Sequence, residues 1–322
     1  MRIGPSHVFT ALTAVVVMAV VWMHYGTDDG LSTISTGISE TLIGESLKST
    51  MARSEKLWQK TVKQRHEVMA KFGEMGFFPA VNVETYFTTP YSVWDLVPAS
   101  YNCPFEVERI GRMGDGGKWV CGMSKYEKNN RPCIIYSFGV QNESSFGEIS
   151  EEEMLERTNC EIWGYDFSVE AFGPAIQSTY SGRTHFLKAG IAGKTDPSQD
   201  PPFYTIQDLM AKNGHTYIDI LKIDIEYAEF EALTSFDKHT SGSGSDQEYP
   251  IGQMLIEIHL FNRGKTLMEF ITWWEALELR GWRPAWTEPN LLAVTLSLED
   301  KNPRLAEYSL VNVKGKQNPL FR

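Results

Sequence analysis

Basic residues are scarce in this sequence: 30 Lys and Arg stand against 41 Asp and Glu, and the formal net charge of the 322 residues is −11. Proteins that bind nucleic acids need clustered Lys and Arg to displace counterions from the phosphates. We therefore expect no nucleic-acid partner. The loop that follows Phe138 also lacks GxGxxG spacing and a Walker lysine, so a phosphate is not its expected ligand.

No basic residue occurs between the apolar run Val8–Met23 and Lys48, whereas Arg2 and the amino terminus precede that run. The positive-inside rule predicts that the N-terminus stays in the cytosol and that the rest of the chain crosses the membrane. The run is short, which suits an early secretory membrane. Because no A-x-A-like site follows it, we predict a retained signal anchor rather than a cleaved signal peptide, with a buried core helix as a third interpretation.

The segment after this run has few large apolar residues. Gly26–Thr50 is rich in Ser, Thr and Gly, which is typical of a stem. Ser54–Phe72 has apolar residues at near-helical spacing and is predicted to be a helix: a stem helix, a dimer contact or a brace across the domain. The predicted parts are a cytosolic tail and signal anchor (1–25), a stem and helical segment (26–83) and one large domain (84–322). A single-pass type II membrane protein facing the ER or Golgi lumen has this layout; its oligomeric state stays open.

Only four cysteines are present, and in a lumenal domain they can form disulfides. Cys133 lies as far before Gly139 as Cys160 lies before Asp166, so the two would lie side by side if the two apolar runs are parallel neighbours in register. Cys103 would then pair with Cys121. A Cys121–Cys133 pair and free buried thiols are the alternatives.

Strand-like apolar runs alternate with helical patterns over the large domain, which predicts an α/β fold with a mostly parallel sheet. Right-handed crossovers then place the carboxyl ends of the parallel strands at one edge. A closing β-hairpin is predicted at the end of the domain. The predicted strands are a run ending before Gly139 and then 161–166, 184–191, 218–225, 251–260, 283–296 and 305–313, and the predicted helices include 169–179, 205–213 and 266–279.

The first strand breaks at Gly139 into a polar loop that opens a helix. A glycine allows a tight turn beside a ligand, and the free N–H groups of the helix face that ligand. The next strand ends in Asp166, where such folds place the carboxylate that holds ribose hydroxyls. A nucleoside-type ligand such as S-adenosylmethionine is therefore predicted. Its expected contacts are Gly139, Val140, Asn142 and Glu143 under the methionine half, Asp166 at the ribose, and Phe167 and Ile191 at the adenine.

Four ionisable residues converge at the predicted reaction edge, because Asp224 and Glu226 end the fourth strand and Glu257 and His259 end the fifth. Residues two apart in a strand share a face, so Asp224 and Glu226 are expected to point together. The predicted catalytic residues are Asp224, Glu226 and His259. They could form a divalent-metal site or supply a base aimed at a hydroxyl. Ion pairs with Lys118, Lys188 or Lys222 are the structural alternative.

Five motifs follow one another along the large domain. They are Asp115-Gly-Gly-Lys-Trp-Val-Cys121, Cys133-x-x-Tyr-Ser-Phe-Gly139, the aromatic-Asp pair ending at Asp166, Leu221-Lys-x-Asp-x-Glu226 and Glu257-x-His259. In these motifs and their order, the sequence resembles a methyltransferase-like protein family related to the FkbM methyltransferases, over roughly Glu106–Asn312. One departure is Tyr227, where the family usually has a glycine, and this residue bears on how closely a substrate can approach.

The resemblance implies a Rossmann-like class I methyltransferase fold, with a seven-stranded, mostly parallel sheet and a terminal hairpin. It also implies an S-adenosylmethionine-dependent enzyme that methylates an oxygen of a small molecule or glycan. The expected membrane contact is the anchor predicted from the N-terminal apolar run. A lumenal glycosyltransferase that uses the Asp224 and Glu226 acids is an alternative. Another alternative, suggested by Tyr227, is a methyltransferase fold that has no catalytic activity and serves as a binding module.

Overall fold

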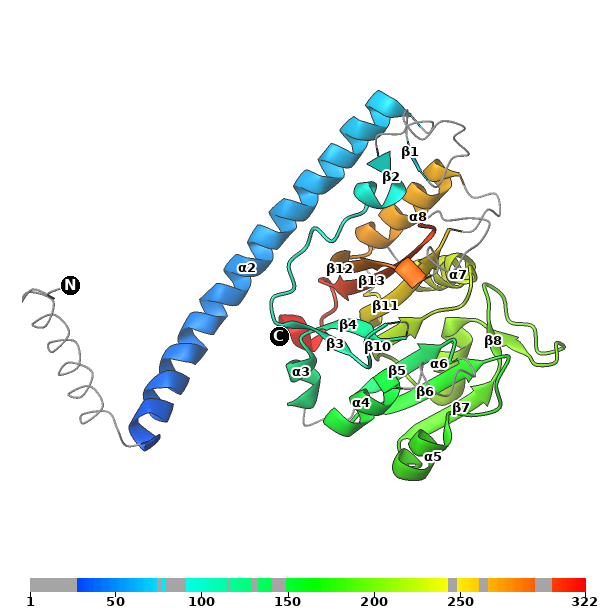
Figure 1. The fold of residues 1–322 in the computed structure, drawn as a ribbon, viewed down its shortest axis with the longest axis horizontal. Coiled ribbons are helices and arrows are strands. Elements are labelled where there is room, and N and C mark those ends of the chain that lie inside the picture. Colours follow the sequence, from blue (N-terminus) through cyan, green and yellow to red (C-terminus); the bar gives the residue numbers. More distant parts are fainter. Residues whose placement is uncertain are drawn as a thin grey trace, which may run out of the picture. The chain divides into compact units, whose positions relative to one another are not determined.

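The computed structural model describes residues 28–73, 77–78, 91–114, 116–128, 133–140, 149–242, 248–260, 266–292 and 303–322 (Figure 1). The chain divides into two units, Met1–Arg53 and Ser54–Arg322. In the first unit the described residues belong to helix α2, Asp28–Phe72, which begins before the predicted start at Ser54. Val8–Met23 lies outside the described residues. Of the helices in the described ranges, none has the length and apolar character needed to cross a membrane.

A seven-stranded sheet forms the centre of the second unit (Figure 1). Its order is β12-β13-β11-β10-β5-β6-β7. Strand β13 runs opposite to the other strands of this sheet, which all point the same way. The predicted α/β class, the mostly parallel sheet and the terminal hairpin are therefore confirmed. The strands are β5 (Ile134–Phe138), β6 (Glu161–Asp166), β7 (Thr184–Lys188), β10 (Ile218–Ile223), β11 (Ile251–His259), β12 (Trp282–Pro289) and β13 (Leu305–Asn312).

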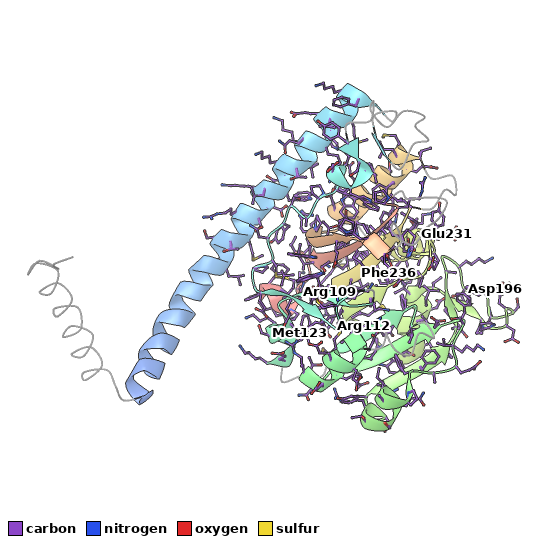
Figure 2. All side chains as sticks on the ribbon, viewed as in Figure 1. Arg109, Arg112, Met123, Asp196, Glu231 and Phe236 are labelled. Atoms are coloured by element: carbon purple, nitrogen blue, oxygen red, sulfur yellow. A yellow bond between two sulfur atoms is a disulfide. The ribbon has the colours of Figure 1, made fainter. Side chains whose placement is uncertain are left out.

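Helices cover both faces of this sheet and bury one apolar cluster on each side. One cluster joins the strands to α6 (Ile206–Asn213), α7 (Glu229–Ser241) and α8 (Leu267–Leu279). Phe236 of α7, labelled in Figure 2, is among its buried members. The other cluster joins the strands to α3 (Met123–Glu127), α4 (Ile149–Arg157) and α5 (Pro174–Tyr180). Strands buried on both faces read as continuous apolar runs, which is why the sequence located them.

Several short elements differ from the predicted boundaries. The third strand ends at Lys188, and Gly190–Ile191 forms a separate strand, β8, that pairs with β9 (Phe203–Tyr204). The fourth strand ends at Ile223, so Asp224 and Glu226 lie beyond it. β3 (Val107–Ile110) and β4 (Lys118–Cys121) form an antiparallel hairpin. The remaining elements are β1 (Phe77–Phe78), β2 (Tyr91–Ser92), η3 (Val93–Leu96) and η4 (Pro319–Phe321).

The part of α2 that lies in the second unit is bound to the domain by buried charges. Arg65 is 3% exposed and donates two hydrogen bonds to the carboxylate of Glu278 on α8, at 2.8 and 2.9 Å. Glu55 accepts from the guanidinium of Arg283 on β12 at 2.7 and 2.9 Å. Of the three roles that the sequence left open for this segment, the brace across the domain is the one these contacts support.

Two disulfides are present, Cys103–Cys121 and Cys133–Cys160. Ile134 pairs with Glu161 across β5 and β6, so the two cysteines that precede these strands face each other with their Cα atoms 4.3 Å apart. This is the parallel, in-register arrangement on which the predicted pairing depended. The Cys121–Cys133 pair and the free thiols are excluded.

Candidate functional site

A cavity of about 440 Å³ opens at the carboxyl edge of the sheet, beside the ends of β5, β6 and β10. Its described lining includes three carboxylates, Asp166, Asp224 and Glu226, and no Lys or Arg. The other lining residues are Gly139, Tyr165, Phe167, Ser168, Ala189, Gly190, Ile191, Phe203, Ile225 and Ala228. A larger cavity of about 850 Å³ lies between α7 and α8, but none of the predicted site residues lines it. The smaller cavity is therefore the candidate site.

Gly139 allows the two central strands to approach each other at this cavity. Its φ is +77°, and a Cβ atom built on it would lie 1.8 Å from the carbonyl oxygen of Asp224. Only glycine fits both the backbone angle and the space. Val140, the next residue, is 2% exposed and packs in the apolar cluster under α4 rather than along the cavity. Asn142 and Glu143 lie outside the described residues.

Asp166 ends β6 and is 6% exposed. Its Oδ1 accepts hydrogen bonds from the backbone N–H of Ser168 at 2.6 Å and from the Ser168 hydroxyl at 2.7 Å. These bonds hold the carboxylate at the wall of the cavity, which is where the sequence predicted a ribose contact.

An aromatic pair forms another part of the wall. Phe167 is 58% exposed, and its ring lies nearly parallel to that of Phe203, with the centroids 6.2 Å apart and an interplanar angle of 27°. Ile191 is buried beside them. Phe203 was not predicted from the sequence, because only the pairing of β9 with β8 brings it here. A Cβ on Gly190 would lie 2.2 Å from the Phe203 ring, so the glycine makes room for it.

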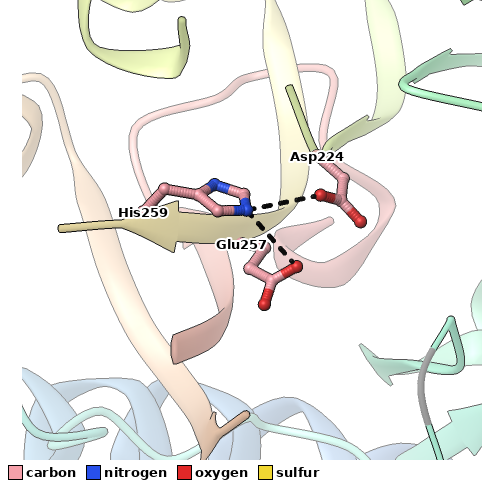
Figure 3. Close-up of side chains that lie close together, drawn as sticks. All are labelled: Asp224, Glu257 and His259. Carbon is pink, nitrogen blue, oxygen red and sulfur yellow. Dashed lines mark ion pairs between the residues drawn. The ribbon is translucent and has the colours of Figure 1, made fainter. Parts of the chain in front are cut away.

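Asp224, Glu257 and His259 form a compact group at the ends of β10 and β11 (Figure 3). Nε2 of His259 lies 3.7 Å from Oδ1 of Asp224 and 3.7 Å from Oε2 of Glu257. Glu257 and His259 are 4% and 1% exposed, whereas Asp224 also reaches the cavity. The group thus connects the cavity to buried titratable side chains.

Glu229, in the first turn of α7, orients His259. Its Oε1 accepts the backbone N–H of His259 at 2.8 Å and lies 3.3 Å from Nδ1 of the ring. Nε2 is left facing the other two carboxylates. Burial lowers the pKa of His259, but the hydrogen bond to Glu229 and the charges of Glu229, Glu257 and Asp224 outweigh it and raise the pKa to about 9. Glu229 was not among the predicted site residues.

Lys118 enters the group from the β3–β4 hairpin. Its Nζ donates to Glu307 on β13 and lies 3.6 Å from Oδ2 of Asp224. The ion-pair interpretation of Lys118 is therefore confirmed, whereas Lys188 pairs with Glu170 and is not part of the group. Burial lowers the pKa of Lys118, but the charges of Glu307, Asp224 and Glu257 outweigh it and raise the pKa.

The two carboxyls of the group differ in pKa. Burial raises the pKa of Asp224, but the charges of Lys118, Lys222 and His259 outweigh this and leave it below its usual value. Burial and the charge of Asp224 raise the pKa of Glu257 to about 8. The Glu257 carboxyl also accepts a hydrogen bond from Asn290 at 2.8 Å. Near pH 7, therefore, Glu257 keeps a proton while Asp224 is ionised.

The predicted set Asp224, Glu226 and His259 is not brought together as a unit. Because β10 ends at Ile223, the backbone turns at Glu226 (φ +53°), and this exposed side chain lines the cavity instead of joining the buried group. The expectation that Asp224 and Glu226 share a strand face is wrong for this reason. Within the described part of the chain, Asp224, Glu257 and His259 could each offer one ligand atom to a cation, and these atoms lie within 4.8 Å of one another.

A family model and one known protein that match this chain are both described as methyltransferases or methyltransferase-like. A family model described as a methyltransferase domain matches residues 82–296. The human protein described as probable methyltransferase-like protein 24 is 26% identical over 145 residues, which cover 42% of this chain and 35% of that protein, so the chain spans about a third of the relative's length.

Two solved structures are remotely similar. The Methanococcus jannaschii fibrillarin pre-rRNA processing protein has 11% identity and a TM-score of 0.34, over 58% of this chain and 68% of that chain. The 16S rRNA methylase ArmA has 8% identity and a TM-score of 0.26, over 59% and 78%.

Proposed function

Because the chain belongs to the methyltransferase domain family, we propose that it binds S-adenosylmethionine in the cavity at the carboxyl edge and methylates a hydroxyl oxygen. The observation that carries this proposal is the charge of the cavity. Its described lining holds three carboxylates and no basic side chain. Such a lining favours a ligand with a cationic sulfonium and ribose hydroxyls, and it repels the diphosphate of a sugar nucleotide. The glycosyltransferase alternative is disfavoured on the same ground.

The cavity residues have complementary roles in this proposal. Asp166 would accept the ribose hydroxyls, and the aromatic pair of Phe167 and Phe203 would flank the adenine. Gly139 would let the methionine half lie close to the backbone. When bound, S-adenosylmethionine supplies the methyl group. The chain itself has to position the acceptor oxygen in line with that group and to receive the hydroxyl proton.

Asp224 is suited to receive that proton, because it lines the cavity and contacts His259 behind it. Lys118 and His259 hold it ionised, and His259 is oriented in turn by Glu229. A carboxylate that is ionised at neutral pH can orient a hydroxyl and accept its proton as the oxygen is methylated. Glu226 borders the same cavity and would contact the acceptor rather than the proton network.

The acceptor and the location are also proposals. We propose that the chain is related to the FkbM enzymes. By that resemblance, the acceptor is a hydroxyl group of a glycan or of another molecule in the secretory pathway. The two disulfides are compatible with an oxidising lumen. The proposed topology remains a type II protein anchored in the ER or Golgi membrane by Val8–Met23. Digestion of the C-terminus by protease in intact microsomes would contradict it.

The test of the cofactor is calorimetry on the full chain with S-adenosylhomocysteine, S-adenosylmethionine and UDP-sugars. We expect binding of the first two only. Asp166→Ala should weaken S-adenosylhomocysteine binding at least tenfold, since hydrogen bonds to a charged group contribute roughly 1.5–3 kcal/mol each. Ser168→Ala is the matched control: it removes the hydroxyl bound to Asp166 but keeps the carboxylate. Unchanged affinity in Asp166→Ala would remove this residue from the site.

The test of turnover is transfer of a labelled methyl group to a panel of glycan and small-molecule hydroxyls. Asp224→Asn should lower turnover by about 10²–10⁴, the usual range for lost acid–base catalysis. Cofactor binding without transfer to any acceptor would favour the silent binding module.

A second candidate role for the buried group is a divalent-cation site, favoured by the convergence of Asp224, Glu257 and His259. Manganese titrated into the metal-free chain would then bind with micromolar or better affinity, and His259→Asn would abolish this binding. Full turnover in excess chelator would exclude the cation site and leave proton acceptance as the role of the group.

A further inference from the structure

Lys222 is a buried lysine that lies outside the cavity. It is 6% exposed and sits on β10 between residues of the core. Ile220, two residues earlier and so on the same face, packs in the apolar cluster that contains Met154 and Leu155 of α4. A buried ammonium is retained only where polar partners offset its lost hydration. Its partners therefore show which part of the fold depends on it.

The first partner is the turn that follows β5. Nζ of Lys222 donates to the carbonyl oxygen of Gly139 at 2.9 Å. The pairing of β5 with β10 ends at Phe138 and Ile223, and at φ +77° Gly139 turns away from the strand. A charge-assisted hydrogen bond from Lys222 thus satisfies a carbonyl that the sheet no longer uses.

The second partner is Glu151, in the first turn of α4. Its Oε1 lies 3.6 Å from Nζ of Lys222 and accepts from the Ser137 hydroxyl at 2.7 Å. Its Oε2 accepts from the Ser150 hydroxyl at 2.7 Å. Glu151 is 2% exposed, and its carboxylate is surrounded by the Lys222 ammonium and the two serine hydroxyls.

The ion pair therefore connects the turn after β5 to the first turn of α4. Lys222 donates to the carbonyl oxygen of Gly139, and Glu151 accepts from Ser150 at the start of α4. Neither Lys222 nor Glu151 lines the cavity, whereas Gly139 does. The pair can thus act on a ligand through the position of Gly139, in addition to the charge that Lys222 places near Asp224.

We infer that Lys222 and Glu151 form a clamp between the turn at Gly139 and the first turn of α4, and that this clamp holds Gly139 in the position required for cofactor binding. They are positioning residues that do not touch the cofactor. This inference rests on the proposed function, because it assigns the clamp to the cofactor side of that site. The clamp requires a buried cation at position 222, so an arginine at this position should partly replace the lysine.

The test uses the full chain with both members of the clamp neutralised, Lys222→Met with Glu151→Gln, so that no buried charge is stranded. We expect S-adenosylhomocysteine affinity to fall about tenfold, which corresponds to about 1.4 kcal/mol. Hydrogen exchange at the amides of Val140, Glu151 and Glu152 should rise about tenfold as well. Lys222→Arg, with Glu151 unchanged, should keep most of the wild-type affinity and most of the wild-type protection from exchange. Lys222→Gln with Glu151→Gln, which also leaves no unpaired buried charge, is the second variant if the first does not fold.

The matched control is a second buried ion pair, Arg65 with Glu278, which binds α2 to α8. Arg65→Met with Glu278→Gln should lower the melting temperature without changing S-adenosylhomocysteine affinity or exchange near Val140. A folded clamp variant with wild-type affinity and wild-type exchange would overturn the inference. A wild-type chain that binds no S-adenosylhomocysteine would overturn the proposed function, and the exchange comparison would still decide whether the clamp exists.

Discussion

At the scale of single residues, Tyr227 adopts a backbone conformation that favours glycine. Its φ is +86°, and Glu226 before it has φ +53°. Its ring packs against Phe230, with the centroids 5.2 Å apart. Non-glycine residues at such angles cost on the order of 1–3 kcal/mol and concentrate at functional sites. The resemblance expects a glycine at this position, so the backbone keeps a turn that suits glycine while the side chain differs.

A pair of variants separates the backbone strain from the side chain. Tyr227→Ala and Tyr227→Gly both remove the ring, but only glycine relieves the positive φ. Tyr227→Gly should therefore be more stable than Tyr227→Ala by about 1 kcal/mol in urea unfolding. Both should alter acceptor preference and keep S-adenosylhomocysteine affinity. Equal stability of the two variants would contradict the strained backbone.

His259 predicts a pH dependence of stability. Its pKa is raised to about 9 in the folded chain, against an ordinary value near 6.5. The stabilisation from this group is therefore fully present below pH 6.5 and is lost as the pH rises through about 9. The stability difference between the wild type and His259→Asn should shrink over that window. Glu229→Gln, which weakens the partner of Nδ1, should move the loss to lower pH; a flat difference from about pH 6 to pH 10 would exclude the raised pKa.

At the scale of elements, the second half of α2 is part of the domain. Its apolar residues Val68, Met69 and Phe72 pack against the core under α8, and Trp58 donates to Glu278 at 2.9 Å. Glu278 is 5% exposed, and Arg65 supplies the positive charge that balances its carboxylate. The packing of α2 on α8 therefore depends on both members of this ion pair.

Loss of one member of this pair should destabilise the domain. Arg65→Met leaves the Glu278 carboxylate buried without its cation and should cost about 3–5 kcal/mol of unfolding free energy. Lys63→Met, which removes an exposed ion pair with Glu67 on the same helix, is the control and should change little. Urea unfolding of the three chains gives the comparison. A small cost for Arg65→Met would mean that α2 does not brace the domain.

At the scale of the whole molecule, the two disulfides join segments that the fold has already brought together. Cys133–Cys160 connects the starts of neighbouring strands across 27 residues of sequence, and Cys103–Cys121 connects the β3–β4 hairpin to the segment before it. Such bonds persist in an oxidising compartment, which is the compartment that the proposed topology requires.

Removal of the Cys133–Cys160 disulfide, which closes the longer of the two loops, should lower the stability of the whole domain. Cys133→Ala with Cys160→Ala should cost about 3 kcal/mol, since a cross-link over a loop of this length restricts the unfolded chain by roughly that amount. Reductant should lower the melting temperature of the wild type by more than that of the double variant, which keeps only Cys103–Cys121. Equal shifts in the two chains would contradict a stabilising Cys133–Cys160 bond.

The order of the elements was readable from the sequence because buried strands and amphipathic helices leave different apolar periods. The runs before Gly139, up to Asp166 and over 251–260 became β5, β6 and β11 with small shifts. The Cys133–Cys160 pair followed from equal spacing in two parallel strands. Boundaries at turns were less accurate: β10 ends before Asp224 because Gly139 and Glu226 turn the backbone there, and no apolar period records such a turn.

By itself the sequence determined the α/β class, the edge at which the site lies, and Gly139, Asp166, Asp224 and His259 as residues at that edge, because each ends an apolar run and parallel strands end together. Only the tertiary structure decided which charges meet. Glu229 reaches His259 from the next helix, Lys118 reaches Asp224 from a separate hairpin, and Phe203 reaches Phe167 through a short strand pair. Contacts between elements far apart along the chain depend on packing, which has no period in the sequence.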